Sequence, residues 1–238
     1  MGCAMAELRT FDLLLFAAGT FVAALVTGVA GFAFGIVAAA VWLHFLPPAH
    51  ATALIVAYGL IVQGISVWKL RRSIRLARLL PFLAGAVIGV PIGVELLHWT
   101  APVMLRISIG IVLILFSLYN LMRPQFAPVA AGKAADGVIG VLNGIIGGAT
   151  GLAGIVVTIW STLRGWPRDE QRTVFQPIGV GVFLLTGIWL GGTGLVDAET
   201  LRLLVIGLPL LLAGTWPDFG FMCGSTKPGF ARWCWVCS

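Results

Sequence analysis

Two glycine-rich stretches decide the fold: TGVAGFAFGIVAAAVW at residues 27–42 and NGIIGGATGLAGIVVTIW at residues 143–160. They lie inside the uncharged runs Leu13–Phe45 and Gly137–Leu163. Both runs are longer than the roughly 20 helical residues that cross a bilayer. Glycine accepts backbone angles that other residues avoid, so it permits a break in a helix. The sequence therefore predicts two helices that are each interrupted within the membrane.

The composition of the whole chain is that of a membrane protein. Of the 238 residues, 59% are hydrophobic and 10% are charged, and the mean hydropathy is +1.03. A soluble domain carries roughly 25% charged residues, so this chain lacks the polar groups that would cover a water-exposed surface. Five more uncharged apolar runs complete the pattern: Ala49–Trp68, Leu79–Val94, Ile107–Met122, Val174–Val196 and Leu203–Trp216. The sequence predicts an all-α, polytopic helical membrane protein.

The two glycine-rich stretches also match each other. Four pairs align at a constant offset of 116 residues (144 − 28): Gly28 with Gly144, Gly31 with Gly147, Ala33 with Ala149, and Gly35 with Gly151. We interpret this as an internal duplication into two repeats of about four membrane segments, each starting with a glycine-broken helix. The expected divisions are an N-terminal repeat at 1–122, a linker at 123–136 and a truncated C-terminal repeat at 137–216.

The last 22 residues, 217–238, do not continue this plan. Hydropathy falls at Pro217, and the segment ends with the C-x-x-C pair Cys234 and Cys237. If one base is lost after the Trp216 codon, the restored frame permits AGLRLYVRLDEAGFRAVVLGL, a charged loop that leads into a new apolar run. We therefore expect an out-of-frame tail and a lost eighth helix. The alternative is a functional thiol pair, which needs a lowered thiol pKa or further metal ligands.

Basic residues predict the orientation of the chain in the membrane. Five of them crowd the loop after the second span: Lys69, Arg71, Arg72, Arg75 and Arg78. The positive-inside rule places this loop in the cytoplasm. With that loop inside, the chain begins inside and three arginines fall outside, a conflict with the same rule that the neighbouring Asp169 and Glu170 only soften: Arg164, Arg168 and Arg172.

These motifs resemble the sulfite exporter TauE/SafE family of bacterial membrane transporters. The resemblance rests on GVAGFAFGIV and NGIIGGATGLAGI in the two glycine-rich stretches, on GWPRDEQR before the sixth span, and on LPLLLAGTW at 208–216. It implies eight spans in two repeats, a place in the bacterial plasma membrane, and movement of sulfur-containing anions and organic acids without ATP. The sequence departs from the family pattern after Trp216.

We expect the substrate site where the two broken helices approach each other. The N-terminal end of a half-helix directs N–H groups and a positive dipole end at an anion. The candidates are backbone-exposing glycines, neighbouring donors and one amide within a span: Gly31, Gly35, Gly147, Gly148, Gly151, Thr27, Asn143, Thr150 and Gln176. The alternative role of the glycines is close packing between helices.

The sequence thus predicts an integral membrane transporter for a small anion such as sulfite, an organosulfonate or a related organic acid. The expected partners are the lipid bilayer, the anion and a coupling proton or sodium ion, with no cofactor and no nucleic acid. No span holds a Ser/His/Asp set, paired carboxylates or a His/Cys cluster, so we expect neither an enzyme nor a metal site. The alternatives are a membrane scaffold and a truncated transporter without activity.

Overall fold

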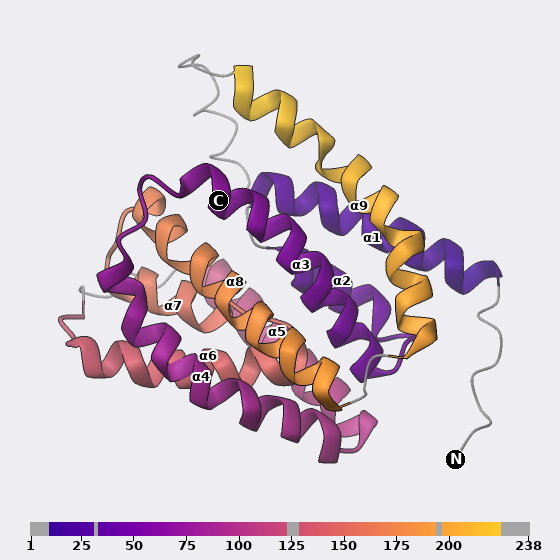
Figure 1. Cartoon of the computed structure of the whole chain (residues 1–238), viewed down its shortest axis with the longest axis horizontal. Coiled ribbons are helices and arrows are strands. Elements are labelled where there is room, and N and C mark those ends of the chain that lie inside the picture. Colours follow the sequence, from indigo (N-terminus) through magenta and orange to yellow (C-terminus); the bar gives the residue numbers. More distant parts are fainter. Residues whose placement is uncertain (1–9, 31–32, 123–128, 194–196, 225–238) are drawn as a thin grey trace.

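The computed structural model describes residues 10–30, 33–122, 129–193 and 197–224, and within these ranges it contains helices and no strand (Figure 1). The helices are α1 (Thr10–Ala30), α2 (Phe34–Trp42), α3 (Pro48–Leu70), α4 (Leu76–Trp99), α5 (Pro102–Met122), α6 (Lys133–Thr150), α7 (Ile155–Leu163), α8 (Arg168–Thr193) and α9 (Ala198–Gly224). The prediction of an all-α fold is confirmed.

Five helices of the described ranges are long and apolar enough to cross a membrane: α3, α4, α5, α8 and α9. Their outward faces are apolar as well. On α5, for example, Ile111, Ile114 and Leu118 are each at least half exposed. Contiguous exposed apolar surface of this kind is rare on soluble proteins and suits contact with lipid. The prediction of a polytopic membrane protein is confirmed.

The second glycine-rich segment folds back on itself instead of crossing the bundle. The indole N–H of Trp160, near the end of α7, donates to Oδ1 of Asp136, near the start of α6, over 2.8 Å. The backbone N–H of Val129, before α6, donates to the carbonyl of Leu163 over 2.9 Å. The end of α7 therefore lies beside the start of α6. We call this antiparallel pair the second hairpin.

The first glycine-rich segment folds back in the same way. The rings of Phe16 on α1 and Trp42 on α2 stack with their centroids 5.0 Å apart. A Cβ atom placed on Gly19 of α1 would lie 2.9 Å from Val41 Cγ1. The end of α2 thus lies beside the first half of α1, and we call this pair the first hairpin. Nine-residue helices such as α2 and α7 are about 13 Å long, less than half of a bilayer core of about 30 Å.

The starts of α3, α5 and α9 meet at one end of the bundle, which we call the His50 end. His50 lies 2.7 Å from the hydroxyl of Thr200 in a hydrogen bond, and Arg106 donates to the carbonyl of Leu46 over 3.2 Å. Asp197 caps α9 by accepting from the backbone N–H of Thr200 over 2.9 Å. Partial burial would raise the pKa of Asp197, but hydrogen bonds from Thr200 and the nearby His50 hold that pKa below its usual value.

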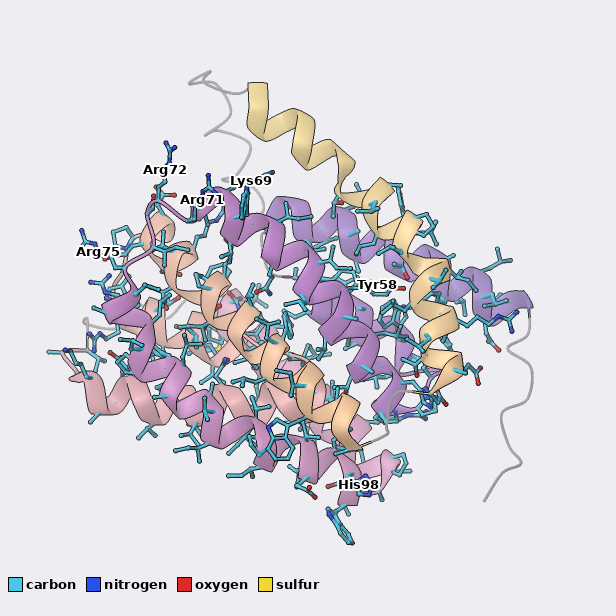
Figure 2. All side chains as sticks on the ribbon, viewed as in Figure 1. Tyr58, Lys69, Arg71, Arg72, Arg75 and His98 are labelled. Carbon is cyan, nitrogen blue, oxygen red and sulfur yellow. The ribbon has the colours of Figure 1, made fainter. Side chains whose placement is uncertain are left out.

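The opposite end, which we call the basic end, joins segments that are distant in the sequence. Arg78 near the start of α4 forms an ion pair with Glu170 in the first turn of α8. Arg164, which follows α7, donates to the carbonyl of Ala131 just before α6. Figure 2 shows the cations of the loop between α3 and α4 at this end: Lys69, Arg71, Arg72 and Arg75.

These contacts correct the predicted topology. The prediction assumed that each broken segment crosses the membrane once. In the structure each hairpin enters the bundle from one end and returns to the same end, and the two hairpins enter from opposite ends. Arg164 and Arg172 therefore lie at the basic end with Arg78, and the conflict with the positive-inside rule disappears. The first hairpin opens at the His50 end, so α1 starts opposite the basic loop. The sequence predicted that the chain begins on the same side as the basic loop. The structure places the start of α1 on the opposite side, so that prediction is wrong.

The most extensive helix contact joins α4 to α6 through glycine. Three glycines spaced by four residues on α4 face three on α6: Gly85, Gly89, Gly93, Gly140, Gly144 and Gly148. A Cβ atom on Gly89 would overlap the carbonyl oxygen of Val141, and one on Gly148 would lie 2.7 Å from the carbonyl oxygen of Val90. Main chain therefore packs directly on main chain, as small residues permit between membrane helices.

An aromatic cluster fastens the first hairpin to its neighbours. Trp42 and Tyr58 are fully buried and their rings pack with Phe34 at centroid distances of 5.8–6.0 Å. The hydroxyl of Tyr58, on α3, shares its one hydrogen between the carbonyls of Leu203 and Leu204 on α9, at 2.9 and 3.0 Å. The cluster thus connects α2, α3 and α9 around one hydrogen-bonded hydroxyl.

Each half of the chain supplies a hairpin followed by long helices, α3 to α5 in the first and α8 with α9 in the second. The assignment of these halves as repeats stays a prediction. Helix α9 continues to Gly224, beyond the boundary expected at Trp216. The thiol pair Cys234 and Cys237 lies outside the described residues, so the out-of-frame tail also stays a prediction.

We predict that Arg72 and Arg172 lie on the same side of the membrane and Ala198 on the other. Single cysteines at these positions, in a variant whose four native cysteines are serine, would be labelled with a membrane-impermeant maleimide. Arg72→Cys and Arg172→Cys should label only after permeabilisation of the cells, and Ala198→Cys should label in intact cells. Labelling of the two arginine positions from opposite sides would contradict the hairpin topology.

We predict that Gly89→Ala lowers the free energy of unfolding by about 1–3 kcal/mol, because the added methyl group overfills the contact between α4 and α6. Gly110→Ala on α5 is the matched control, since a Cβ atom there meets nothing within 4 Å. Thermal unfolding in one detergent measures both variants. Equal stability of the two variants would show that the helices do not approach as described.

Candidate functional site

Two glycines reverse the chain between α6 and α7. Gly151 has φ of 72° and Gly154 has φ of 125°, angles that side-chain-bearing residues rarely adopt. The N–H of Gly151 donates to the carbonyl of Gly147 over 2.8 Å, which ends α6. The N–H of Gly154 donates to the side-chain oxygen of Asn143 over 3.0 Å. The turn at 151–154 is therefore built by two glycines and one buried amide.

The tip of the second hairpin touches the start of α2 in the first hairpin. A Cβ atom on Gly35 would lie 3.2 Å from Leu152 Cδ2 and 3.5 Å from the carbonyl oxygen of Gly151. It would also lie 3.2 Å from Ile55 on α3. Gly35 and Gly151, two of the predicted site residues, are thus brought together across the centre of the bundle.

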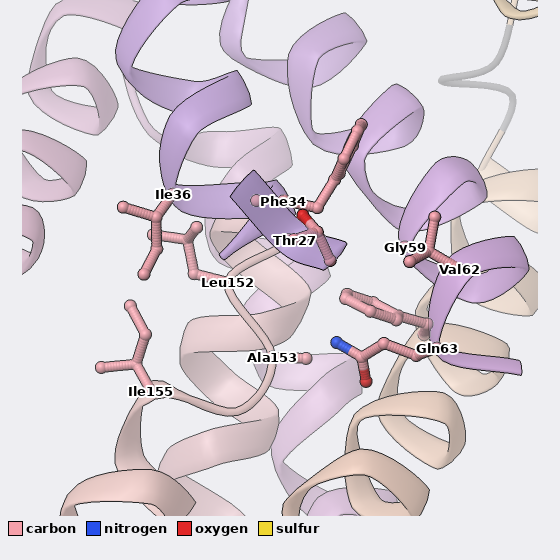
Figure 3. Close-up of a pocket in the computed structure, with 12 residues that line it drawn as sticks. Thr27, Phe34, Ile36, Gly59, Val62, Gln63, Leu152, Ala153 and Ile155 are labelled. Carbon is pink, nitrogen blue, oxygen red and sulfur yellow. The ribbon is translucent and has the colours of Figure 1, made fainter. Parts of the chain in front are cut away.

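A cavity of about 20 Å³ lies at this meeting point (Figure 3). That volume holds roughly one water molecule. Its lining comes from both hairpins and from two long helices, α3 and α8: Thr27, Phe34, Gly35, Ile36, Gly59, Val62, Gln63, Gly151, Leu152, Ala153, Ile155 and Phe183. None of these lining residues is charged, so the polarity of the cavity comes from backbone groups, Thr27 and Gln63.

Gln63 carries the one amide side chain in the cavity wall. It lies on α3 with 6% of its surface exposed, and Figure 3 shows the amide directed toward the turn that contains Ala153. Its Oε1 atom has no hydrogen-bond partner among the described residues. The amide packs against Gly179 of α8, where a Cβ atom would overlap it. A buried amide oxygen without a partner costs free energy.

Three predicted side-chain donors have structural hydrogen bonds in this conformation. Thr27 lines the cavity, and its hydroxyl donates to the carbonyl of Ala23 over 2.6 Å. The hydroxyl of Thr150 donates to the carbonyl of Ile146 over 2.6 Å. Asn143 is fully buried and holds the turn through its oxygen, while its Nδ2 atom has no partner within the described residues.

The remaining predicted residues lie in other surroundings. Gly147 faces α8, where a Cβ atom would lie 2.6 Å from Val182 Cγ1, whereas Gly148 faces α4 and lies in the glycine contact described above. Gln176 is buried on α8 and does not line the cavity. Gly31 lies outside the described residues.

Sequence reasoning missed the contributions of the two long helices. Phe183 and Gly59 lie against each other, since a Cβ atom on Gly59 would be 2.6 Å from a ring carbon of Phe183. Nothing local in the sequence marks these residues, because the helix faces that meet are set by packing. Gln63 did carry a signal, as an amide within an otherwise apolar span. The described residues contain no group of three His, Cys, Asp or Glu side chains able to hold a metal ion.

We predict that Gly151→Ala destabilises the protein, because a left-handed conformation costs an alanine about 1–2 kcal/mol. The new methyl group would also lie 2.9 Å from Ile55 Cγ2. Gly191→Ala on α8 is the control, since a Cβ atom there meets nothing within 4 Å. Thermal unfolding compares the two variants, and an unchanged melting temperature for Gly151→Ala would exclude the turn geometry described here.

Comparison with known protein families identifies the family of this chain. Residues 15–217 match the family model described as Sulfite exporter TauE/SafE, a match that includes both glycine-rich segments. No curated protein and no solved structure matches the chain. The match ends beside the boundary predicted at Trp216. Members of this family are transporters and not enzymes. The chain is therefore a multi-pass membrane protein of the sulfite exporter TauE/SafE family.

Proposed function

We propose that this protein moves a small oxyanion, such as sulfite, an organosulfonate or a related organic acid, across the bacterial plasma membrane. The observation that carries the proposal is the contact between Gly35 and Gly151, where the tips of two hairpins from opposite ends meet at a cavity. The family description supports sulfite as the first substrate to test. The substrate binds between the two tips.

Backbone chemistry at the cavity suits an anion. Phe34 and Ile155 begin α2 and α7, and both line the cavity. The first N–H groups of a helix have no partner inside that helix, and its N-terminal end carries a partial positive charge. Two such helix starts therefore face one cavity from opposite hairpins, so an oxyanion is attracted there without a fully charged side chain.

Gln63 supplies a side-chain ligand beside these helix starts. Figure 3 shows its amide directed toward the turn that contains Ala153, so the Nε2 group can donate to an oxyanion held between the tips. Hydrogen bonds to charged groups contribute about 1.5–3 kcal/mol. Gln63 thus adds a neutral hydrogen-bond donor to the two helix starts.

The cavity is too small for the proposed substrate in this conformation. It holds roughly one water molecule, so an oxyanion of four or more heavy atoms requires the tips to separate. Transporters with inverted repeats expose such a site to each side in turn by moving one part against another. In this protein the moving boundary lies between Gly35 and Leu152. A coupling proton or sodium ion belongs to the same proposal and is tested by imposing either gradient.

Sulfite flux into proteoliposomes tests the function. We predict that Gln63→Leu lowers the flux about tenfold or more, because the hydrogen bonds to the anion are lost. Gln63→Glu should lower it further, because a carboxylate of the same shape repels the anion. Gly64→Ala is the neighbouring control and should keep its flux, since a Cβ atom there meets nothing within 4 Å.

Stability measured on the same preparations separates loss of binding from loss of folding. Equal flux from folded Gln63→Leu and from the unchanged protein would remove Gln63 from the site. If the unchanged protein moves neither sulfite nor organosulfonates under any ion gradient, the proposal fails and a membrane scaffold becomes the better interpretation.

A further inference from the structure

A second and larger pocket opens at the basic end. Its volume is about 390 Å³, within the range of roughly 300–1,000 Å³ typical of ligand sites. The loop between α3 and α4 forms one wall and the first turns of α8 form the other. The polar residues of the lining are Ser73, Arg75, Arg78, Asp169, Glu170, Arg172 and Thr173.

The charges of this pocket leave a positive excess. Arg78 is held by Glu170 and lies over the ring of Trp166, 4.7 Å from its centroid. The guanidinium groups of Arg75 and Arg172 form no ion pair with any other described residue, and Asp169 is the one remaining carboxylate of the lining. Two cations therefore face one anion, which favours a ligand that carries negative charge.

The surroundings of the pocket are those of a membrane boundary. Trp68, at the end of α3, is 69% exposed, and Arg71 stacks over its ring at 4.4 Å. Tryptophan is enriched where lipid headgroups meet the hydrocarbon. Leu76 and Leu80, on the first turns of α4, are 70% and 63% exposed. Apolar surface for acyl chains thus begins within a few residues of Arg75 and Arg78.

We propose that this pocket binds the phosphate of an anionic phospholipid headgroup, with the acyl chains on the α4 surface at Leu76 and Leu80. Arg75 and Arg172 contact the phosphate from opposite walls, and Ser73 and Thr173 offer hydroxyl donors beside them. Basic pockets between membrane helices bind anionic headgroups in this way. A soluble anion would gain nothing from the apolar rim, which is why a lipid is the better occupant.

Bound lipid would add a contact between α4 and α8, which already pack against each other. Arg75 precedes α4, which packs on the second hairpin, and Arg172 lies on α8, which carries Phe183 into the central cavity. A headgroup between them reinforces the ion pair of Arg78 with Glu170. The expected effect is stabilisation of the folded protein, independent of whether it transports sulfite.

The test uses the full chain in nanodiscs of phosphatidylcholine with increasing fractions of phosphatidylglycerol, followed by thermal unfolding. Phosphatidylglycerol should raise the melting temperature of the unchanged protein. The double variant Arg75→Ala/Arg172→Ala should need about a tenfold higher fraction for the same rise. The double variant Arg71→Ala/Arg72→Ala is the matched control, because it removes the same charge from the same end outside the pocket, and its response should fall clearly less than that of the pocket variant.

Two results would overturn the proposal. Equal loss of response in both double variants would show that general surface charge, and not the pocket, attracts the lipid. Equal stabilisation by glycerol 3-phosphate in pure phosphatidylcholine would show a site for soluble phosphate. Melting of every variant in pure phosphatidylcholine establishes that each is folded before lipid is varied. Sulfite flux is not part of this readout, so failure of the transport proposal leaves the result interpretable.

Discussion

A chain that reverses inside a membrane must satisfy its own backbone, because hydrocarbon offers no hydrogen bonds. The bond from the N–H of Gly154 to Asn143 meets this demand at the tip of the second hairpin. The hydroxyl of Thr150 adds a second bond by accepting from the N–H of Leu152 over 3.2 Å. With these groups satisfied, α7 can start within the bundle. The cavity, the convergence of two helix starts and the topology of the basic residues all follow from that reversal.

The two hairpins are secured by different kinds of contact. The first is fastened by side chains, with Trp42 and Tyr58 interlocked and one hydroxyl bonded to α9. The second is fastened by main chain against the glycines of α4. A side-chain contact can be replaced by another side chain of similar volume, whereas a contact between two backbones requires glycine on both sides. The second hairpin is therefore held to a long helix through main chain, and the first through side chains.

Composition and run length were sufficient to predict a helical membrane protein, and the glycine pattern located both interruptions and the meeting of Gly35 with Gly151. The direction of the chain after each interruption was not predictable from glycine alone, because the same residue permits a kink and a reversal. The basic residues around Arg164, which the predicted topology placed outside against the positive-inside rule, were the sequence signal of the reversal. We did not use that signal, because we assumed that each segment crosses the membrane. Phe183 was not predictable, because helix orientation decides what lines a cavity, and orientation depends on packing across the whole bundle. Gln63 carried a signal as an amide within an apolar span, but the sequence alone did not show that it faces the cavity.

The glycine contact between α4 and α6 also limits how this gene can change. Glycine is the smallest residue, so every missense mutation at Gly89 or Gly140 adds atoms to a space that is already filled. At most protein contacts, a larger residue on one side can be accommodated by a smaller one on the other. Here each of these glycines faces main chain, which no substitution can shrink. The six positions therefore have no compensating partners, and their codons should tolerate synonymous change alone.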